Sequence, residues 1–487
     1  MKARIILLGL GPGDPNLLTI QAQRILESCD EVYLRTSHHP TVAGFPASLQ
    51  VHSFDNLYEK LPSFEEVYAQ IVEKILELGR RPEGVVYGVP GHPFVAEATC
   101  PEVARRAQLE GLPVQVVEGI SFIEPSLTAL SLDPLPHLTI MDALELATDH
   151  VPPFPPDAPA LIAQVHSKAI ANEVKLTLME IYPDEHPVRL VHAAGTPQQM
   201  VKDLPLHAID QDESIGLLTS LFVPALEKGT SFESFQEIIA HLRAPNGCPW
   251  DREQTHQTLR TNLLEETYEA LDALDTDDPQ KMREEFGDLL LQITLHAQIA
   301  NEYEEFNMAQ VIKTVHDKIV RRHPHVFGDW QVSGVENVLQ NWEKIKAAER
   351  AEEYQDNGGP QKGLLDGVTK ALPALSQAEE IQRRAARVGF DWPDTRGVVD
   401  KINEECHELV NAEDLASRAD ELGDLLFAVV NLARHYEIDA ESALRETNTR
   451  FRKRFSHIEQ SAREQGKSLN ELTLDEMESL WQEAKKL

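Results

Sequence analysis

The chain has 487 residues, too many for one hydrophobic core, and its length predicts roughly two to four domains. Forty-five Lys and Arg against 80 Asp and Glu leave a net charge of −35, which excludes a general nucleic-acid binder because phosphate backbones require a basic footprint. No window approaches the roughly 18 apolar residues that a membrane span needs. The cysteines contain no CxxC pair, so we expect a cytoplasmic protein without disulfides or a zinc site (Cys29, Cys100, Cys248, Cys406).

Up to about residue 225, short apolar runs alternate with amphipathic segments. We expect strands at residues 5–10, 85–87, 114–117, 160–165 and 189–193, and helices at residues 20–28, 64–78 and 98–109. This alternation predicts an α/β domain with a largely parallel sheet. The proline-rich stretch VPPFPPDAP at 151–159 either divides this domain into two lobes or forms a long internal connection.

After about residue 225, β-branched runs become rare and apolar residues recur with a period of 3.6, which predicts an all-α region. The polar stretch EYQDNGGPQKG at 353–363 is the expected linker inside this region. The sequences on its two sides share motifs in the same order. The offsets between copies fall steadily, from 142 at Trp250 and Trp392 through 139 at EETYE and EECHE and 136 at EFGD and ELGD to 132 at the basic pairs. This order indicates a duplicated unit, and we expect domains at 1–225, 226–355 and 356–487.

Each copy carries acidic side chains at helical spacing. The EExxE motif supplies Glu265, Glu266 and Glu269 in the first copy and Glu404, Glu405 and Glu408 in the second, and the ExxD motif adds Glu285, Asp288, Glu421 and Asp424. The ExxD helix continues into apolar sequence, so we expect it to be largely buried. Carboxylates grouped at the edge of a core repel one another, and a hard divalent cation relieves that repulsion. Oxygen ligands without Cys or His favour Mg²⁺ or Mn²⁺, and we expect these ten acids to catalyse phosphate chemistry.

Basic side chains follow the acids in each copy. Lys318 and Arg322 are four residues apart, as are Arg450 and Arg454, so each pair projects from one face of a helix. In so acidic a chain, these pairs are candidates to bind phosphates. Trp342 and Trp481 either cover a nucleotide base or pack the helical bundle.

The ordered set of GCPWD at 247–251, EExxE, ExxD, RRHPHVF at 321–327 and VGFDW at 388–392, followed by the second EExxE and ExxD, resembles the tandem-domain MazG proteins. The resemblance covers residues 230–487 and implies an all-α homodimer that hydrolyses nucleoside triphosphates to monophosphate and pyrophosphate. Position 450 is Arg where the family favours Lys. The implied metal ligands are Glu405, Glu408, Glu421 and Asp424, with Glu266, Glu269, Glu285 and Asp288 as their equivalents. The implied nucleotide contacts are Lys401, Glu404, Arg450, Arg454 and Trp481.

Three N-terminal segments place glycine directly after an apolar strand: GLGPGDPNLLT at 9–19, VVYGVPGHP at 85–93 and VEGISF at 117–122. They do not form the GxGxxG signature of a dinucleotide site. Together they resemble the tetrapyrrole (corrin and porphyrin) methylases over residues 1–225, which implies two α/β lobes with S-adenosylmethionine between them. His92 stands where many of these methylases carry Asp. The residues expected at this cofactor are Gly9, Gly11, Gly13, Asp14, Pro90, Gly91, Gly119, Ile120 and Ser121.

The sequence therefore predicts a Mg²⁺-dependent nucleoside triphosphate pyrophosphohydrolase with an attached methylase-like domain, and no nucleic-acid or membrane partner. An alternative treats the helical half as a nucleotide- and metal-sensing module that regulates a methyltransferase. A third hypothesis makes methyl transfer the principal reaction. The N-terminal motifs are less complete than the repeated acidic motifs, and this difference favours the hydrolase.

Overall fold

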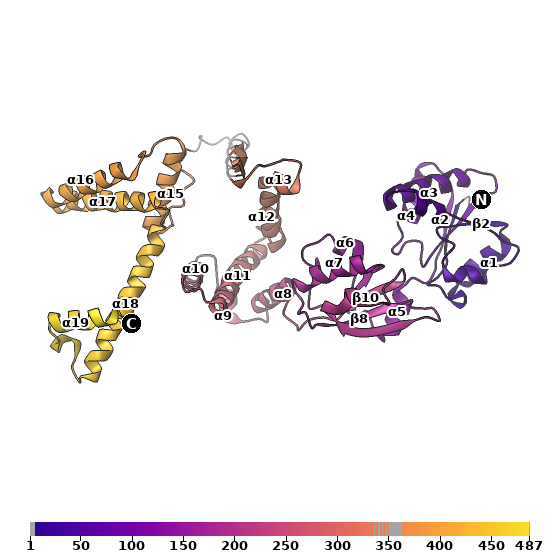
Figure 1. Ribbon diagram of the computed structural model, residues 1–487, viewed down its shortest axis with the longest axis horizontal. Helices are drawn as coiled ribbons and strands as arrows, with labels where there is room; N and C mark the ends of the chain where they lie inside the picture. The colour runs from indigo at the N-terminus through magenta and orange to yellow at the C-terminus, as the bar shows by residue number, and fades with distance from the viewer. Residues whose placement is uncertain are drawn as a thin grey trace. The chain divides into compact units, whose positions relative to one another are not determined.

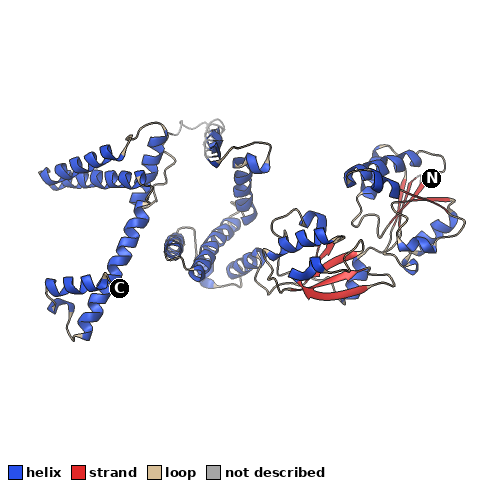
Figure 2. Ribbon diagram, in the orientation of Figure 1, coloured by secondary structure: helices blue, strands red, loops and turns tan. Residues whose placement is uncertain are grey.

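The computed structural model describes residues 5–335, 337–338, 341–342, 344–346, 348–349 and 363–486. The chain forms two compact units, Met1–Cys248 and Pro249–Leu487. The first unit contains the strands, and the second is helical (Figure 2). The linker expected at 353–363 lies outside the described residues except for Gly363. Among the described helices, none has the length and apolar character needed to cross a membrane.

The first lobe of the N-terminal unit is a parallel five-stranded sheet in the order β3-β2-β4-β1-β5. Helices cover both of its faces, α2 to α4 on one side and α1 on the other (Figure 1). Strand residues therefore point into apolar layers in both directions, and Ile5, Leu7 and Leu8 are all fully buried. The expected strands and helices of this lobe are confirmed. Its elements are β1 (Ile5–Gly9), α1 (Ile20–Ser28), β2 (Glu31–Leu34), β3 (Gln50–Ser53), α2 (Asp55–Lys60), α3 (Phe64–Gly79), β4 (Val85–Val89), α4 (Thr99–Leu109) and β5 (Val114–Val117).

The second lobe has a five-stranded sheet in the order β6-β7-β10-β8-β9, packed between α6 and α7 on one face and α5 on the other. Only β6 and β7 pair in parallel; the other three pairs are antiparallel. The prediction of a largely parallel sheet is wrong for this lobe, because β8 and β9 are joined by a connection too short for a crossover helix. Its elements are α5 (Ile123–Leu130), β6 (Thr139–Asp142), α6 (Ala143–Leu146), β7 (Ala160–Ala163), α7 (Lys168–Met179), β8 (Pro187–His192), β9 (Met200–Pro205), β10 (Thr219–Val223) and α8 (Phe232–Arg243).

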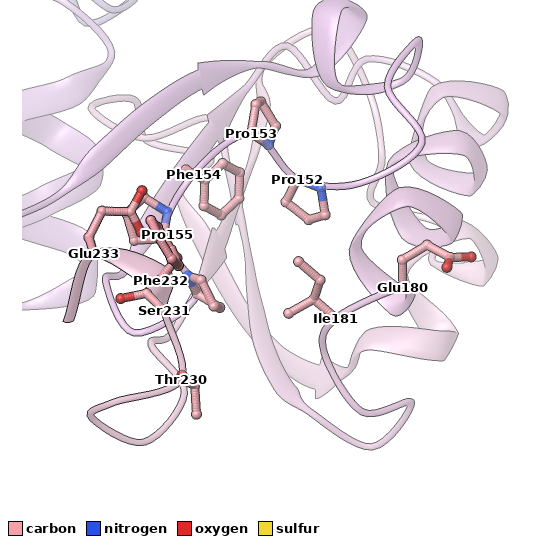
Figure 3. Close-up of a pocket in the computed structure, with 11 residues that line it drawn as sticks. Pro152, Pro153, Phe154, Pro155, Glu180, Ile181, Thr230, Ser231, Phe232 and Glu233 are labelled. Atoms are coloured by element: carbon pink, nitrogen blue, oxygen red, sulfur yellow. The ribbon is translucent and has the colours of Figure 1, made fainter. Parts of the chain in front are cut away.

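The proline-rich stretch at 151–159 lies inside the second lobe, between α6 and β7, and is therefore a long internal connection. Phe154 is buried, and the Tyr182 hydroxyl donates to the Pro156 carbonyl at 3.5 Å. With Ile181 and the start of α8, this stretch borders a pocket of about 520 Å³ (Figure 3). None of the predicted site residues lines that pocket.

The first half of the helical unit is built on an antiparallel hairpin of α10 and α11 (Figure 1). Asp278 caps α11 by accepting from the backbone amides of Gln280 at 3.0 Å and Lys281 at 3.3 Å. Pro279 follows at the first helical position, where no backbone donor is needed. The helices of this half are α9 (Pro249–Glu253), α10 (Arg260–Asp275), α11 (Pro279–Glu302), α12 (Met308–Arg322) and α13 (Pro324–Phe327).

The second half repeats this plan with a hairpin of α16 and α17. Asp414 caps α17 as Asp278 caps α11, accepting from the Ser417 amide at 2.9 Å. Helix α15 packs on α17 and α18, and α19 folds back on α18 around Ile458 and Leu472. The helices of this half are α15 (Ala374–Arg387), α16 (Thr395–Asn411), α17 (Leu415–His435), α18 (Ala440–Glu464) and α19 (Leu474–Ala484).

The ExxD helices α11 and α17 are buried on one side only. On α11, Leu290 is 39% and Ile293 44% exposed; on α17, Leu426 is 50% and Val429 45% exposed. The prediction that these helices are largely buried is therefore wrong for the single chain. Each helix packs against its hairpin partner, and in the single chain its remaining apolar stripe faces solvent.

Candidate metal centres

The first group of carboxylates lies on the α10–α11 hairpin. Because the two helices run antiparallel, Glu266 on α10 faces Glu285 and Asp288 on α11, and one oxygen from each lies within 4.8 Å of the others. Burial, followed by the charges of Asp288 and Glu269, raises the pKa of Glu266 above its usual range. Burial and the charge of Glu269 likewise raise the pKa of Glu285. Glu269 therefore acts on this group through its charge, although it lies outside the closest set of oxygens.

The second group lies at the equivalent place on the α16–α17 hairpin. Here one oxygen from each of Glu405, Glu408 and Glu421 lies within 4.8 Å of the others. Burial, then the charge of Glu408 and the adjacent Glu405 carboxylate, raises the pKa of Glu421. Asp424 is exposed and contributes to that shift through its charge. The structure thus brings together the equivalents Glu266/Glu285 and Glu405/Glu421 in both copies, whereas the third member comes from ExxD in the first copy and from EExxE in the second.

Glu405 is the deepest of these acids, with only 3% of its surface exposed. Its Oε1 lies 2.7 Å from the Lys401 ammonium, which also lies 2.9 Å from Glu404. These carboxylates, Glu405 first, raise the pKa of Lys401. The second oxygen of Glu405, Oε2, is buried without a hydrogen-bond partner. A buried carboxylate oxygen with no donor is costly, and a hard cation coordinated by neighbouring carboxylates would satisfy it. The second group therefore fits a divalent metal ion.

The predicted phosphate-binding residues do not reach either carboxylate group in the single chain. Arg322 on α12 pairs with Glu349 at 2.7 Å, and Arg450 on α18 pairs with Glu446 at 3.1 Å. Arg454 lies over the Trp481 ring, 5.5 Å from its centroid. Within the described part of the chain, these residues and Lys318 form no ion pair with the ten predicted acids. The basic pairs lie on α12 and α18, whereas the acids lie on the two hairpins, α10–α11 and α16–α17.

The two tryptophans have packing partners. Trp481 packs on Phe451, with ring centroids 5.0 Å apart, and belongs to the small core between α18 and α19. The Lys346 ammonium lies 3.5 Å from the centre of the Trp342 ring. Trp481 therefore packs in the single chain, and the interpretation that it covers a nucleotide base stays a prediction.

The N-terminal glycines allow three strand ends to come unusually close together. A Cβ on Gly119 would lie 2.2 Å from the Gly91 carbonyl oxygen, and a Cβ on Gly9 would lie 2.5 Å from the Gly119 amide nitrogen. Gly11 and Gly91 exchange backbone hydrogen bonds at 3.2 and 2.8 Å, with Gly11 at φ 72°. Only glycine fits these contacts. The turn also reaches the second lobe, because a Cβ on Gly13 would lie 2.7 Å from the Thr196 methyl group.

The other predicted cofactor residues surround this point. Asp14 caps the short turn that follows the loop, accepting from the Asn16 amide at 2.8 Å. Ser121 is buried, and its hydroxyl donates to Glu124 at 2.6 Å. Pro90 and Ile120 flank the glycines at the ends of β4 and β5. The structure therefore gathers the predicted cofactor residues at the carboxyl edge of the parallel sheet, where open α/β sheets bind ligands.

Sequence reasoning missed a buried polar network behind this edge. Arg35, directly after β2, forms an ion pair with Glu97 and donates to the hydroxyls of Tyr58 at 3.0 Å and Tyr68 at 2.9 Å. Glu97 also accepts from the Thr99 amide at 2.8 Å. The network ties the end of β2 to the loop that carries Gly91. The sequence signal for this network is an arginine directly after a buried strand. That signal does not identify Glu97 as the partner, because Glu97 lies 62 residues further along the chain.

The sequence of the chain matches two known families. The family model for the MazG nucleotide pyrophosphohydrolase domain matches residues 254–327 and 396–458, and that for the tetrapyrrole (corrin/porphyrin) methylases matches residues 4–210. The two MazG segments contain the two hairpins, which confirms the predicted duplication. The chain thus combines a methylase-type α/β fold with tandem MazG domains.

Individual proteins match either the whole chain or one of its two parts. The uncharacterized protein YabN of Bacillus subtilis is 42% identical over 494 residues, which cover 100% of this chain and 99% of that protein. The nucleoside triphosphate pyrophosphohydrolase/pyrophosphatase MazG of Thermotoga maritima is 42% identical over 53% of this chain and 97% of its own length. A uroporphyrin-III-C-methyltransferase structure from Thermus thermophilus covers 46% of this chain and 93% of its own, with 24% identity and a TM-score of 0.35. The chain belongs to the MazG family, in the form that carries an N-terminal tetrapyrrole methylase domain.

Proposed function

We propose that the helical unit hydrolyses nucleoside triphosphates to nucleoside monophosphate and pyrophosphate with Mg²⁺ or Mn²⁺. The observation that carries this proposal is the pair of carboxylate groups, each at the same place in a hairpin that the MazG family matches. Acidic side chains gather on many protein surfaces. The buried, unpaired oxygen of Glu405 sets this group apart, because it needs a cation or a proton donor.

In this proposal, the acidic and basic residues of the helical unit have two roles, metal binding and nucleotide binding. One carboxylate of each group takes the proton of the attacking water, the bond from the α-phosphorus to its bridging oxygen breaks, and pyrophosphate leaves. When bound, the metal ion supplies charge neutralisation and acidifies the water. The proposed metal ligands are Glu266, Glu269, Glu285 and Asp288 in the first copy and Glu405, Glu408, Glu421 and Asp424 in the second. The proposed nucleotide contacts are Lys401, Glu404, Arg450, Arg454, Trp481, Lys318 and Arg322, with Glu265 as the equivalent of Glu404.

We propose that the protein works as a homodimer. The half-exposed apolar stripes of α11 and α17 would be covered by a second copy. The separation of the basic pairs from the carboxylates supports the same arrangement, since helices of a second copy can approach the exposed side of each hairpin. The oligomeric state of the full chain, measured by analytical ultracentrifugation, tests this part of the proposal.

For the N-terminal unit we propose a site for S-adenosylmethionine at the glycine-lined edge of the first sheet. The close approach of Gly9, Gly91 and Gly119 leaves no side chains between the backbone and a ligand at this edge. Isothermal calorimetry with S-adenosylmethionine tests the proposal, and no heat of binding would contradict it. We also propose a cytoplasmic location, from the free cysteines, and domains at 1–225, 226–355 and 356–487.

Product analysis with ATP and Mg²⁺ tests the hydrolase directly. We expect AMP and pyrophosphate; ADP with orthophosphate would contradict the proposal. The double variant Glu266→Gln/Glu405→Gln should lose about 100-fold or more in hydrolysis, because each change removes a ligand from one metal group. Glu413→Gln, an exposed acid in the loop before α17, is the matched control and should retain activity.

The same variants discriminate against the sensing module, which is the disfavoured alternative. A sensor would bind nucleotide without turnover in the parent protein, and the double variant would then change no rate. The relatives that match the helical half carry hydrolase names, and this favours the enzyme.

A further inference from the structure

The two carboxylate groups differ at one position that faces the buried acid. In the second copy, Lys401 precedes Glu405 by four residues, one helical turn, and its ammonium lies 2.7 Å from Oε1. In the first copy the residue four before Glu266 is Asn262, which carries no charge. The duplication has therefore kept the acids and changed the countercharge beside them.

The lysine stabilises the second group when no metal ion is bound. Glu405 is almost wholly buried, and burying a carboxylate without a partner is strongly unfavourable. Lys401 supplies that partner and reaches Glu404 as well, at 2.9 Å. A metal ion that approaches Glu405 must therefore compete with an ammonium group that is already in place.

The first group has no equivalent partner. One oxygen from each of Glu266, Glu285 and Asp288 lies within 4.8 Å of the others, so three carboxylates gather here in the absence of a cation. Lys281 lies four residues before Glu285 on α11. Among the described contacts, neither Glu266 nor Glu285 pairs with a lysine or arginine. A divalent ion meets less competition here than in the second group.

We propose that Lys401 couples metal and nucleotide binding in the second copy, whereas the first copy binds its metal ion independently of nucleotide. This inference rests on the proposed function. When a cation neutralises Glu405, the Lys401 ammonium keeps only its exposed contact to Glu404 at 2.9 Å, and a triphosphate bound at the same group can then attract it. Triphosphate that draws Lys401 away from Glu405 in turn frees the carboxylate, so each ligand favours the other.

Titration with Mn²⁺, followed by electron paramagnetic resonance of the free ion, tests this coupling in the full chain. Glu266→Gln/Glu285→Gln silences the first group and isolates the second. In that background, Lys401→Asn should tighten Mn²⁺ binding about fivefold without nucleotide, the effect of losing one partly exposed ion pair. Repeating the titration with an α,β-imido triphosphate, which resists cleavage, should show cooperativity in the background chain and little in Lys401→Asn.

The reciprocal change should alter the Mn²⁺ affinity in the opposite direction. In a chain whose second group is silenced by Glu405→Gln/Glu421→Gln, Asn262→Lys should weaken Mn²⁺ binding about fivefold. Lys74→Asn removes a lysine from an ion pair on α3, in the other unit, and controls for net charge; it should change nothing. A misfolded variant binds less metal, so tighter binding by Lys401→Asn cannot arise from misfolding. Unchanged or weaker Mn²⁺ binding by Lys401→Asn would overturn the inference.

Failure of the proposed function has a different signature. If the second group binds metal and nucleotide but the protein cleaves no nucleotide, the Lys401→Asn shift and the cooperativity with the imido analogue both remain, while product analysis finds no AMP or pyrophosphate. If the inference alone is wrong, hydrolysis to AMP and pyrophosphate persists while the parent and Lys401→Asn bind Mn²⁺ equally.

Discussion

Replacing Glu97 with Gln tests the buried network that supports the glycine-lined edge of the first sheet. The Glu97 side chain is 1% exposed and faces the Arg35 guanidinium. Burial works against the Arg35 charge, yet Glu97, Tyr58 and Tyr68 outweigh it and raise the pKa of Arg35. A glutamine at position 97 keeps one oxygen that can accept from the Thr99 backbone amide. Its side-chain NH2 group then faces the Arg35 guanidinium, and both of these groups are donors. The change therefore leaves a mostly buried cation without its anion.

The expected loss of stability follows from the burial of the Arg35–Glu97 ion pair. Breaking a buried ion pair from one side costs about 3–5 kcal/mol. Arg35 is 18% exposed and keeps two tyrosine hydroxyls as acceptors, which places the loss near the lower end, about 3 kcal/mol. For a unit of this size, 1 kcal/mol corresponds to about 2–4 °C, so the N-terminal transition should fall by about 9 °C.

Differential scanning calorimetry of the full chain measures this shift, with the helical unit as an internal reference. Glu102→Gln on α4 is the matched control, because Glu102 pairs with Arg105 on the surface and its loss should move neither transition. The network would be of no structural consequence if Glu97→Gln lowered the N-terminal transition no more than Glu102→Gln.

Three further changes test other parts of the molecule. Gly119→Ala should unfold the first lobe or cost more than Gly111→Ala, and thermal unfolding measures both. The Cβ of Ala at 119 would lie 2.2 Å from the Gly91 carbonyl oxygen, whereas a Cβ at 111 meets open space and adds only the strain of a φ of 68°. Glu421→Gln should stabilise the metal-free helical unit relative to the parent, and increasingly so as pH rises above 4.5. In the parent the pKa of Glu421 is raised, so the folded state loses stability as this carboxyl group ionises. Melting in chelator measures the difference, and identical pH profiles of the two proteins would contradict the raised pKa. Leu426→Asp should dissociate the proposed homodimer in ultracentrifugation, and Leu109→Asp, the same change at an exposed leucine in the other unit, should not.

Helical periodicity was sufficient to predict which acids share a face of one helix, but not which acids meet across two helices. Sequence spacing treats Glu269 and Glu408 as equivalents, and likewise Asp288 and Asp424. The structure places Asp288 in the closest set of the first copy and Glu408 in that of the second. The choice depends on the rotation of each helix about its axis, which is set by packing across the hairpin rather than by local sequence.

The strand pairing of the second lobe likewise depends on contacts between elements rather than on local sequence. The apolar runs at β7 and β8 were recognisable as strands, yet pairing direction depends on which strands meet. Strand β10 enters between β7 and β8 and runs antiparallel to both. Nothing in a short apolar run specifies a neighbour that lies tens of residues away, whereas the first lobe follows the familiar alternation of strand and helix.

The residues that local patterns described least well are those that bear directly on function. The EExxE pattern predicts Glu405 as a metal ligand but does not distinguish it from Glu408, whereas the fold buries Glu405 and leaves one of its oxygens without a donor. Leu290 and Leu426 would read as core, but the single chain leaves them exposed. Repelling acids and uncovered apolar side chains both reduce the stability of the isolated chain. They occur on the same two hairpins, α10–α11 and α16–α17. Under the proposed function, a cation would relieve the first cost and a second copy would relieve the second, so both proposed partners would bind at these hairpins.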